Sequence, residues 1–143
     1  MPDKIIVDFI NDHHILTIAT SKDNISYCCN VFYIYDENKN FLIFSSDYKT
    51  KHACHFMKNP KVSGSIYLHT NIINEIKGLQ LQGYIMELKD KLLKNARKKY
   101  IEKFPSSKFM NLKLWAMKLM FIKMTNNTKE FGKKLIWQDS NDF

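Results

Sequence analysis

FSSDYKTKHACHFMKNPKVSGSI, residues 44–66, is the stretch that decides the fold, because its pattern changes twice within a short distance. It opens on the end of an apolar run, passes through polar residues, and spaces its apolar residues as an amphipathic helix does over residues 49–58. Asn59-Pro60 ends that helix, since proline cannot continue the hydrogen-bond ladder and restricts the residue before it. Residues 62–68 then alternate between two sets of side chains, which predicts a strand with two distinct faces.

Upstream of this stretch, the pattern predicts one helix and three strands. Apolar residues at 3.6-residue spacing indicate a short helix over residues 4–12. Runs rich in β-branched and aromatic residues predict strands over residues 14–20, 25–35 and 41–45. Because the short polar turns SKDN and DENKN join them, the three strands should form an antiparallel meander.

Downstream, two more strands and a helix are expected. Residues 76–88 read as a long strand, in which Gly83 indicates a bulge or a sharp bend. Asp90 suits the N-cap of a helix over residues 91–104. The last strand is expected over residues 112–124. One of its faces should carry Trp115, Met117, Leu119 and Phe121.

The order of these elements sets the fold class. Strands and helices do not alternate in the rhythm of a parallel sheet, which argues against a Rossmann fold. The sequence instead predicts a mainly β fold, a six-stranded antiparallel β-barrel with short helices at its ends. One domain should cover residues 1–143. The polar tail, which closes on the apolar residues 135–137, is not counted among the six strands.

Charge is the most unusual property of the composition. The chain has 22 Lys and Arg against 14 Asp and Glu, a net charge of +8, which suggests an anionic partner. However, Arg97 is the only arginine, whereas proteins that read nucleic acids favour the planar grip of arginine. We therefore attribute most of the excess to a lysine-rich background composition and expect a small anionic ligand rather than nucleic acid.

The cysteines and histidines leave one metal site to consider. An odd number of cysteines with Cys28 next to Cys29 is not a disulfide framework. No signal peptide or membrane-spanning run is expected from the sequence either. The cytoplasm is therefore the expected compartment. His52, Cys54 and His55, with one of the other cysteines, have the ligand types of a zinc site. We prefer the interpretation that Cys54 packs in a short helix while the histidines point partly outward, and expect no metal.

Residues 45–51, SSDYKTK, have the chemistry of an anion site. They lie between a strand end and a helix start, where unpaired N–H groups and the positive end of the helix dipole attract negative charge. The alternative is that Ser45, Ser46 or Asp47 merely caps the helix while the lysines are solvated. A phosphate placed there would meet Ser45, Ser46, Lys49, Thr50 and Lys51.

This segment resembles the FMN-binding split-barrel proteins, the superfamily of pyridoxamine 5′-phosphate oxidase. Within that superfamily the chain resembles a small bacterial subgroup, through the runs NVFYIYDENKNFLIF and LQLQG and the tail TNNTKEFGKKLIW. In that family a strand ending in a hydroxyl residue leads into a helix start with Ser, Arg or Lys, and Asn-Pro closes the helix. The likeness covers nearly the whole chain and rests on the order and spacing of the motifs. It implies a split β-barrel of the FMN-binding type.

The resemblance implies a homodimer that holds FMN between its subunits. The flavin phosphate would lie at residues 45–51 and the ring along the second strand, while the later strands and tail of the partner subunit would close the site. For Trp137, ordinary packing at the dimer interface is an equal alternative. The ring would meet Asn30, Val31, Phe32 and Tyr33, and Lys133 and Trp137 would come from the partner subunit.

Two departures from the oxidases shape the expected function. At the helix start, Thr50 stands where the oxidases carry arginine. The oxidases also hold their vitamin substrate through an arginine and a histidine near the C-terminus, and this chain has no arginine or histidine after Arg97. The resemblance therefore implies an FMN-binding protein, a small flavin-dependent oxidoreductase of unknown substrate and not a pyridoxamine 5′-phosphate oxidase. Whether it turns over a substrate or only binds the cofactor is left open.

Two other functions stay open. One is a non-catalytic module that binds haem or a flavin-like ligand, for which the mid-chain histidines are the candidate ligands: His52, His55 and His69. The other is a binder of nucleic acid or an anionic surface, for which the local basic cluster is Lys94, Arg97, Lys98 and Lys99.

Overall fold

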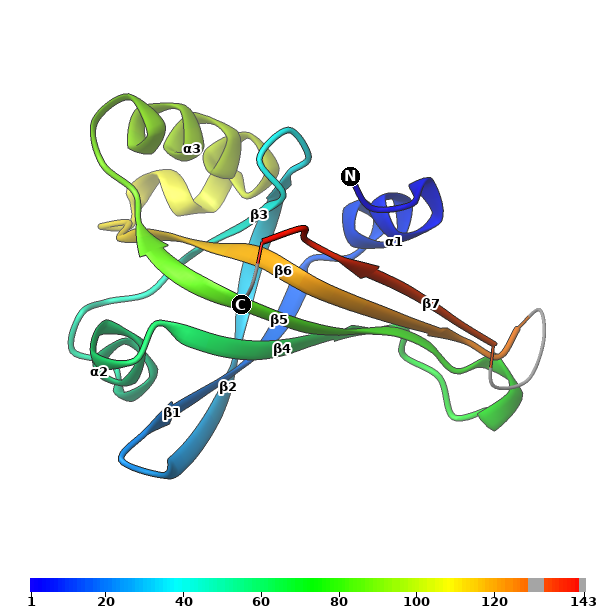
Figure 1. Cartoon of the computed structure of the whole chain (residues 1–143). Helices are drawn as coiled ribbons and strands as arrows, with labels where there is room; N and C mark the ends of the chain where they lie inside the picture. Colours follow the sequence, from blue (N-terminus) through cyan, green and yellow to red (C-terminus); the bar gives the residue numbers. More distant parts are fainter. Residues whose placement is uncertain (129–132, 142–143) are drawn as a thin grey trace.

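The computed structural model of the chain describes residues 1–128 and 133–141, with Lys133 described by its backbone alone. The strands are β1 (Ile15–Lys22), β2 (Ile25–Asp36), β3 (Phe41–Ser45), β4 (Lys61–Tyr67), β5 (Lys77–Glu87), β6 (Leu114–Asn126) and β7 (Lys133–Gln138) (Figure 1). The helices are α1 (Lys4–Asp12), α2 (Lys51–Lys58) and α3 (Asp90–Lys103), and the short 3-10 helices are η1 (Ile73–Glu75) and η2 (Pro105–Phe109). Within the described ranges, no helix is long and apolar enough to cross a membrane.

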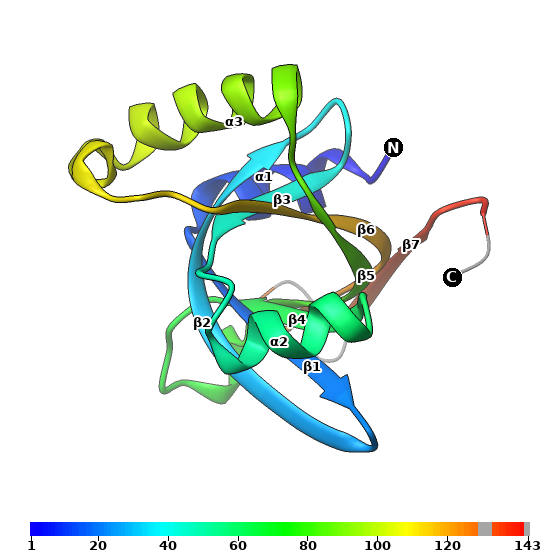
Figure 2. The same cartoon turned by 90° about the vertical axis from the view of Figure 1, so that its left-hand side faces the viewer.

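Six of the strands close into a barrel. They follow the order β3-β2-β1-β4-β5-β6 in the sheet, and β3 pairs with β6 to complete the ring (Figure 1, Figure 2). Every pairing is antiparallel. This confirms the mainly β fold and the antiparallel barrel that the sequence predicts.

The tail adds a strand that the sequence analysis did not count. Residues 121–126 of β6 pair with β7, while residues 114–118 of the same strand pair with β3. Because β6 is long enough to serve both neighbours, β7 extends the sheet from outside the ring. Over the described residues the sheet therefore has seven strands rather than six, although the fold class is unchanged.

A β-bulge opposite Gly83 interrupts the pairing of β5 with β6, as the glycine predicts. Gln82 pairs with Phe121, but the next pair is Gly83 with Leu119, so Met120 has no partner on β5. A Cβ atom at Gly83 would lie 2.1 Å from a backbone carbonyl oxygen of β6. Only glycine allows the two strands to approach this closely.

The bulge also changes which side chains of β6 face the core. Before it, Trp115, Met117 and Leu119 are buried, as predicted. After it, Phe121 is only half-buried, because the extra residue Met120 shifts the alternation by one position. The prediction that Phe121 shares their face is therefore wrong. The buried apolar residues beyond the bulge are Ile122 and Met124.

Two apolar clusters hold the helices onto the barrel. The larger one fills the ring and includes residues of α1 and α2, while α3 covers a smaller one outside it. Figure 2 shows α2 and α3 on opposite sides of the barrel. The larger cluster includes Ile6, Phe9, Leu16, Ile18, Phe44, Phe56 and Ile66, and the smaller one includes Ile34, Ile43, Ala96, Tyr100 and Ala116.

Candidate functional site

The segment between β3 and α2 is tied to the start of β6. The N–H of Ser46 donates to the carbonyl of Lys113 (2.9 Å), and the N–H of Lys113 donates to Oγ of Ser45 (3.3 Å). The buried indole of Trp115 donates through Nε1 to the carbonyl of Ser46 (2.8 Å). These bonds fix the end of β3, so the turn that follows starts from a defined position.

Asp47 and Thr50 build that turn. The carboxylate of Asp47 accepts a hydrogen bond from the N–H of Lys49 (2.8 Å). The backbone carbonyl of Asp47 accepts from both the N–H (3.2 Å) and the hydroxyl (2.8 Å) of Thr50. Oγ1 of Thr50 accepts from the N–H of Ala53 (3.3 Å), which makes Thr50 the N-cap of α2. The helix therefore begins at Lys51, two residues later than predicted, and its cap is a residue that the sequence analysis assigned to the phosphate.

His52 belongs to the same cluster, although the sequence analysis did not place it there. Its Nε2 lies 2.7 Å from Oγ of Ser46 and 3.4 Å from Oγ1 of Thr50. Burial lowers the pKa of the His52 imidazole, because an apolar surrounding disfavours its charged form. The available signal was its position in the first helical turn, from which a polar side chain can reach back to the residues before the helix.

Lys51 connects the start of α2 to β2. Its ammonium lies 4.9 Å from the centre of the Tyr27 ring. One turn later, Nδ1 of the buried His55 lies 3.1 Å from Oγ1 of Thr20, and its ring is 5.9 Å from that of Tyr27. Cys54 is exposed, so the expectation that it packs while His55 points outward is wrong. The helix start is thereby held beside the first half of β2.

The four β2 residues predicted to meet the flavin ring differ in accessibility. Asn30 and Phe32 are exposed, Val31 is half-buried and Tyr33 is fully buried. The Tyr33 hydroxyl donates to a carbonyl of α1 (2.7 Å), so this side chain belongs to the core. A ligand can therefore reach the side chains of Asn30 and Phe32 more readily than those of the other two.

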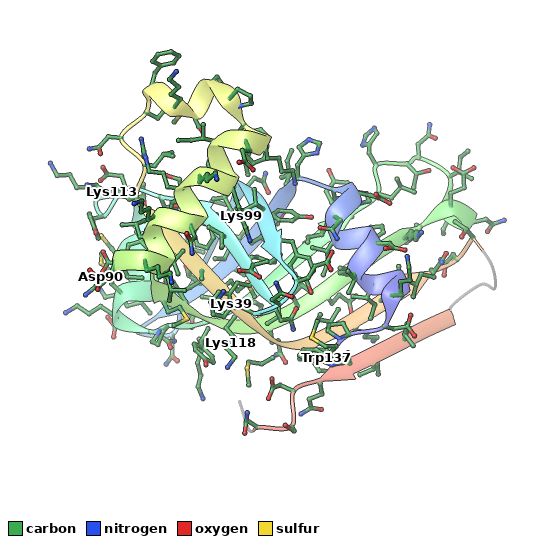
Figure 3. All side chains as sticks on the ribbon, turned by 90° about the horizontal axis from the view of Figure 1, so that it is seen from above. Lys39, Asp90, Lys99, Lys113, Lys118 and Trp137 are labelled. Carbon is green, nitrogen blue, oxygen red and sulfur yellow. The ribbon has the colours of Figure 1, made fainter. Side chains whose placement is uncertain are left out.

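The two residues predicted to come from a partner subunit lie on β7. The backbone of Lys133 pairs with Asn126, while its side chain lies outside the described part of the chain. Trp137 pairs with Ile122 and packs, half-buried, against the barrel core of its own chain; Figure 3 shows its position on β7. Their contribution to a second subunit stays a prediction.

The donor set at the start of α2 fits a phosphate in part. Within the described residues, the N–H groups of Lys51 and His52 have no hydrogen-bond acceptor, and the side chains of Lys49 and Lys51 are exposed. Two free N–H groups and two ammonium groups suit a doubly negative phosphate. Thr50 donates its hydroxyl to the Asp47 carbonyl and Ser46 pairs with His52, so these two would bind a phosphate only by exchanging a present partner. Oγ of Ser45 only accepts, from the N–H of Lys113, and keeps its own O–H as a donor.

The other candidate residues lie apart from this segment. The predicted basic cluster is exposed on α3, and two of its lysines, with Lys39, line a groove of about 290 Å³ between α3 and the β2–β3 hairpin; Figure 3 shows Lys39 and Lys99 there. His69, one of the candidate haem ligands, is exposed on the loop after β4. Among the residues whose side chains are described, no three His, Cys, Asp or Glu side chains are grouped so that they could hold a metal ion.

This architecture is shared with solved split-barrel proteins. A haem-binding protein from Mycobacterium smegmatis has a TM-score of 0.77 and 12% identity, covering 96% of this chain and 59% of that one. An FAD-binding protein from Mesorhizobium loti has a TM-score of 0.68 and 14% identity, and the match covers 85% of this chain and 92% of that one. A Listeria innocua protein described as a pyridoxamine 5′-phosphate oxidase has a TM-score of 0.66 and 14% identity, and the match covers 86% of this chain and 95% of that one. The chain thus has the fold of the pyridoxamine 5′-phosphate oxidase-like split-barrel proteins.

Relatives at higher identity define the particular family. A UPF0306 protein of Yersinia enterocolitica is 40% identical over 138 residues, which cover 95% of this chain and 94% of the relative. A UPF0306 protein of Yersinia pestis is 35% identical over the same length. The chain therefore belongs to the UPF0306 family. No family model matches its sequence. The expected likeness to bacterial split-barrel proteins is confirmed.

Proposed function

We propose that this protein binds FMN as a homodimer and acts as a small flavin-dependent oxidoreductase in the bacterial cytoplasm. The observation that carries the proposal is the start of α2, where free N–H groups and exposed lysines meet beside β2. The fold supports it, since proteins of this architecture include one described as FAD-binding.

The phosphate of FMN would be bound at residues 49–52. The N–H groups of Lys51 and His52 would donate to its oxygens, and the Lys49 and Lys51 side chains would supply charge. Asp47 is the acidic group nearest in sequence, and its carboxylate already accepts from the N–H of Lys49. Because lysine is a point charge without the two-pronged geometry of arginine, the N–H groups would set the orientation of the phosphate.

The flavin ring would lie along β2, against the exposed Asn30 and Phe32 and the backbone near Val31 and Tyr33. Lys51 contacts Tyr27 on the same strand, so the phosphate end of the ligand would lie beside the first half of β2. A second subunit would cover the exposed part of β2 and contribute Lys133 and Trp137. The bound flavin would supply the electron or hydride transfer, and the protein would position it.

An FMN titration of the full chain tests this proposal. We expect FMN fluorescence to be quenched at saturation, and native mass spectrometry to give two subunits with two FMN molecules. Lys51→Ala should weaken FMN binding by about tenfold or more, since it removes one charge-assisted bond.

Lys94→Ala is the matched control, because Lys94 is also an exposed lysine but lies on α3, away from this segment. Its affinity for FMN should equal that of the native chain. An absence of FMN binding, or an equal loss in both lysine variants, would overturn the proposal. Substrate turnover is then sought by flavin reduction with NADH or NADPH, followed by reoxidation with candidate acceptors.

A further inference from the structure

The groove between α3 and the β2–β3 hairpin lies on the other side of the barrel from α2 (Figure 2). Its volume of about 290 Å³ is at the lower end of the range for small-ligand sites, so it suits a small molecule rather than a polymer. None of its lining residues belongs to the site proposed for FMN. Figure 3 shows Lys39 of the hairpin and Lys99 of α3 at this groove.

The floor of the groove is apolar. Phe41 and Ile43 line it from β3, and Ala96 lines it from α3. Leu92 and Tyr100 lie one helical turn before and after Ala96 on the same face of the helix, so a small side chain stands between two large ones. The helix is thereby indented at Ala96. Leu92 also lines the groove and is 43% exposed, which leaves apolar surface for a ligand to cover.

The charges on the hairpin side of the groove already balance each other. The buried carboxylate of Asp36 accepts from the N–H groups of Asn38 (3.1 Å) and Lys39 (3.3 Å). Nζ of Lys39 lies 3.4 Å from the other carboxylate oxygen of Asp36. Because this carboxylate has its own donors and its own counter-ion, the hairpin side neither requires a charged ligand nor strongly repels one.

The helix side of the groove has positive charge without a counter-ion. Within the described residues, the ammonium groups of Lys98 and Lys99 make no hydrogen bond or ion pair, although Glu102 follows them at a spacing that favours one. All three side chains are exposed and line the groove. Glu102 offsets one of the two positive charges, so a ligand with a single negative charge would balance this wall.

Size, floor and charge together define one class of ligand. We propose that this groove binds a small monoanion with an apolar body, such as a carboxylic acid of moderate chain length. Its carboxylate lies near Lys98 and Lys99, and its apolar part lies against the floor where Ala96 indents the helix. This site is separate from the one proposed for FMN and does not depend on it.

Calorimetric titration of the full chain with octanoate tests the proposal. We expect one octanoate to bind per chain. Octanol has the same apolar chain without the charge, and acetate has the charge without the chain. Each should bind about tenfold or more weakly than octanoate, because each lacks one of the two features that the groove recognises.

A pair of double variants tests the charged wall. Lys98→Ala combined with Lys99→Ala should weaken octanoate binding by about tenfold or more and leave octanol binding unchanged, because it removes the charge without changing the floor. Lys91→Ala combined with Lys94→Ala is the matched control, since both of these lysines are exposed on α3 but do not line the groove. Its affinity for octanoate should equal that of the native chain.

Two further variants test the apolar floor. Ala96→Leu should prevent the binding of octanoate and octanol alike, because the larger side chain fills the indentation. Ala96 is buried, so this change can also destabilise the fold, and urea unfolding checks that the variant remains folded. Leu92→Asn changes an exposed position instead, and should weaken both ligands by about threefold or more.

Four results would overturn the proposal. One is the absence of saturable octanoate binding, and another is an equal affinity for octanoate and octanol, which would exclude recognition of the charge. An equal loss in the two double-lysine variants would reduce the effect to the general positive charge of α3. Octanoate that binds only while it separates a dimer would show that a second copy occupies the groove.

Competition with FMN separates this proposal from the preceding one. Saturating FMN should leave the octanoate titration unchanged, and Lys51→Ala should weaken FMN binding alone. Displacement of octanoate by FMN would refute a separate site. Octanoate binding with no FMN binding would instead refute the flavin proposal and leave this one standing.

Discussion

Ser46 and His52 form a side-chain pair across the turn that joins β3 to α2, with Oγ of the serine 2.7 Å from Nε2 of the histidine. The pair closes a turn whose start is already bonded to β6 and whose end is capped by Thr50. A half-buried imidazole is thereby given a polar partner. The turn thus depends on a residue that can change its charge near neutral pH.

Stability should fall below about pH 6.5 more steeply in the native chain than in His52→Gln. Burial lowers the pKa of His52 from 6.5, so the unfolded chain binds this proton more readily than the folded one. Unfolding therefore becomes more favourable as the pH falls from 6.5 toward the lower pKa of the folded state. Glutamine can still bond to Ser46 but does not titrate. Urea unfolding of both proteins at about pH 7.5 and about pH 5.5 measures the difference, and equal losses in the two would contradict it.

Removal of the helix cap should destabilise the protein by about 1 kcal/mol. In Thr50→Ala the N–H of Ala53 loses the Oγ1 atom that accepts from it. Thr50→Ser keeps an oxygen at that place and should remain close to the native stability. The comparison is made by urea unfolding of the three proteins; an alanine variant as stable as the serine variant would show that the cap contributes little.

Gly83→Ala should cost more than about 2 kcal/mol, because its Cβ would lie 2.1 Å from the carbonyl oxygen of Lys118. Gly78→Ala is the matched comparison on the same strand, where the nearest backbone oxygen is 3.0 Å from the added atom. Its loss of stability should be clearly smaller. Denaturant midpoints measure both, and a ranking in the opposite order would mean that the bulge can relax.

Loss of a buried bond should matter more here than loss of an exposed one. Trp115→Phe leaves the carbonyl of Ser46 without its buried indole donor, at a cost of about 1–3 kcal/mol. Tyr48→Phe removes the bond from an exposed hydroxyl to the carboxylate of Glu87, and should cost less than about 1 kcal/mol. Urea unfolding ranks the two variants. Equal costs would show that the segment is not held through Trp115.

The strands of the barrel could be predicted because their patterns are local. The polar turns and β-branched runs place the meander, and Gly83 marks the bulge. What local pattern cannot give is the consequence of the bulge on the facing strand, where Met120 turns Phe121 away from the face of Trp115. β7 was missed for a related reason, since its strand character depends on a neighbour, the second half of β6.

The position of the candidate site along the chain could be predicted, but the hydrogen bonds among its side chains could not. The sequence places hydroxyl groups and lysines at a helix start, and the structure confirms that position. It cannot tell which hydroxyl groups the turn itself uses, because that depends on distances between residues 45–53. Thr50 serves as the cap, and Ser46 pairs with His52, whose part in the cluster follows from three-dimensional proximity.

The division of β6 between two neighbours has a consequence for how the protein behaves in solution. Closure of the ring uses residues 114–118, so a chain cut before β7 would keep a complete barrel. It would, however, expose the backbone N–H and C=O groups of residues 121–126 along an open edge, which invites pairing with other chains. β7 covers that edge and is itself short, with Lys133 and Lys134 at its start. The outer edge of β7 then becomes the edge of the sheet, and we expect its lysines to disfavour pairing with other chains.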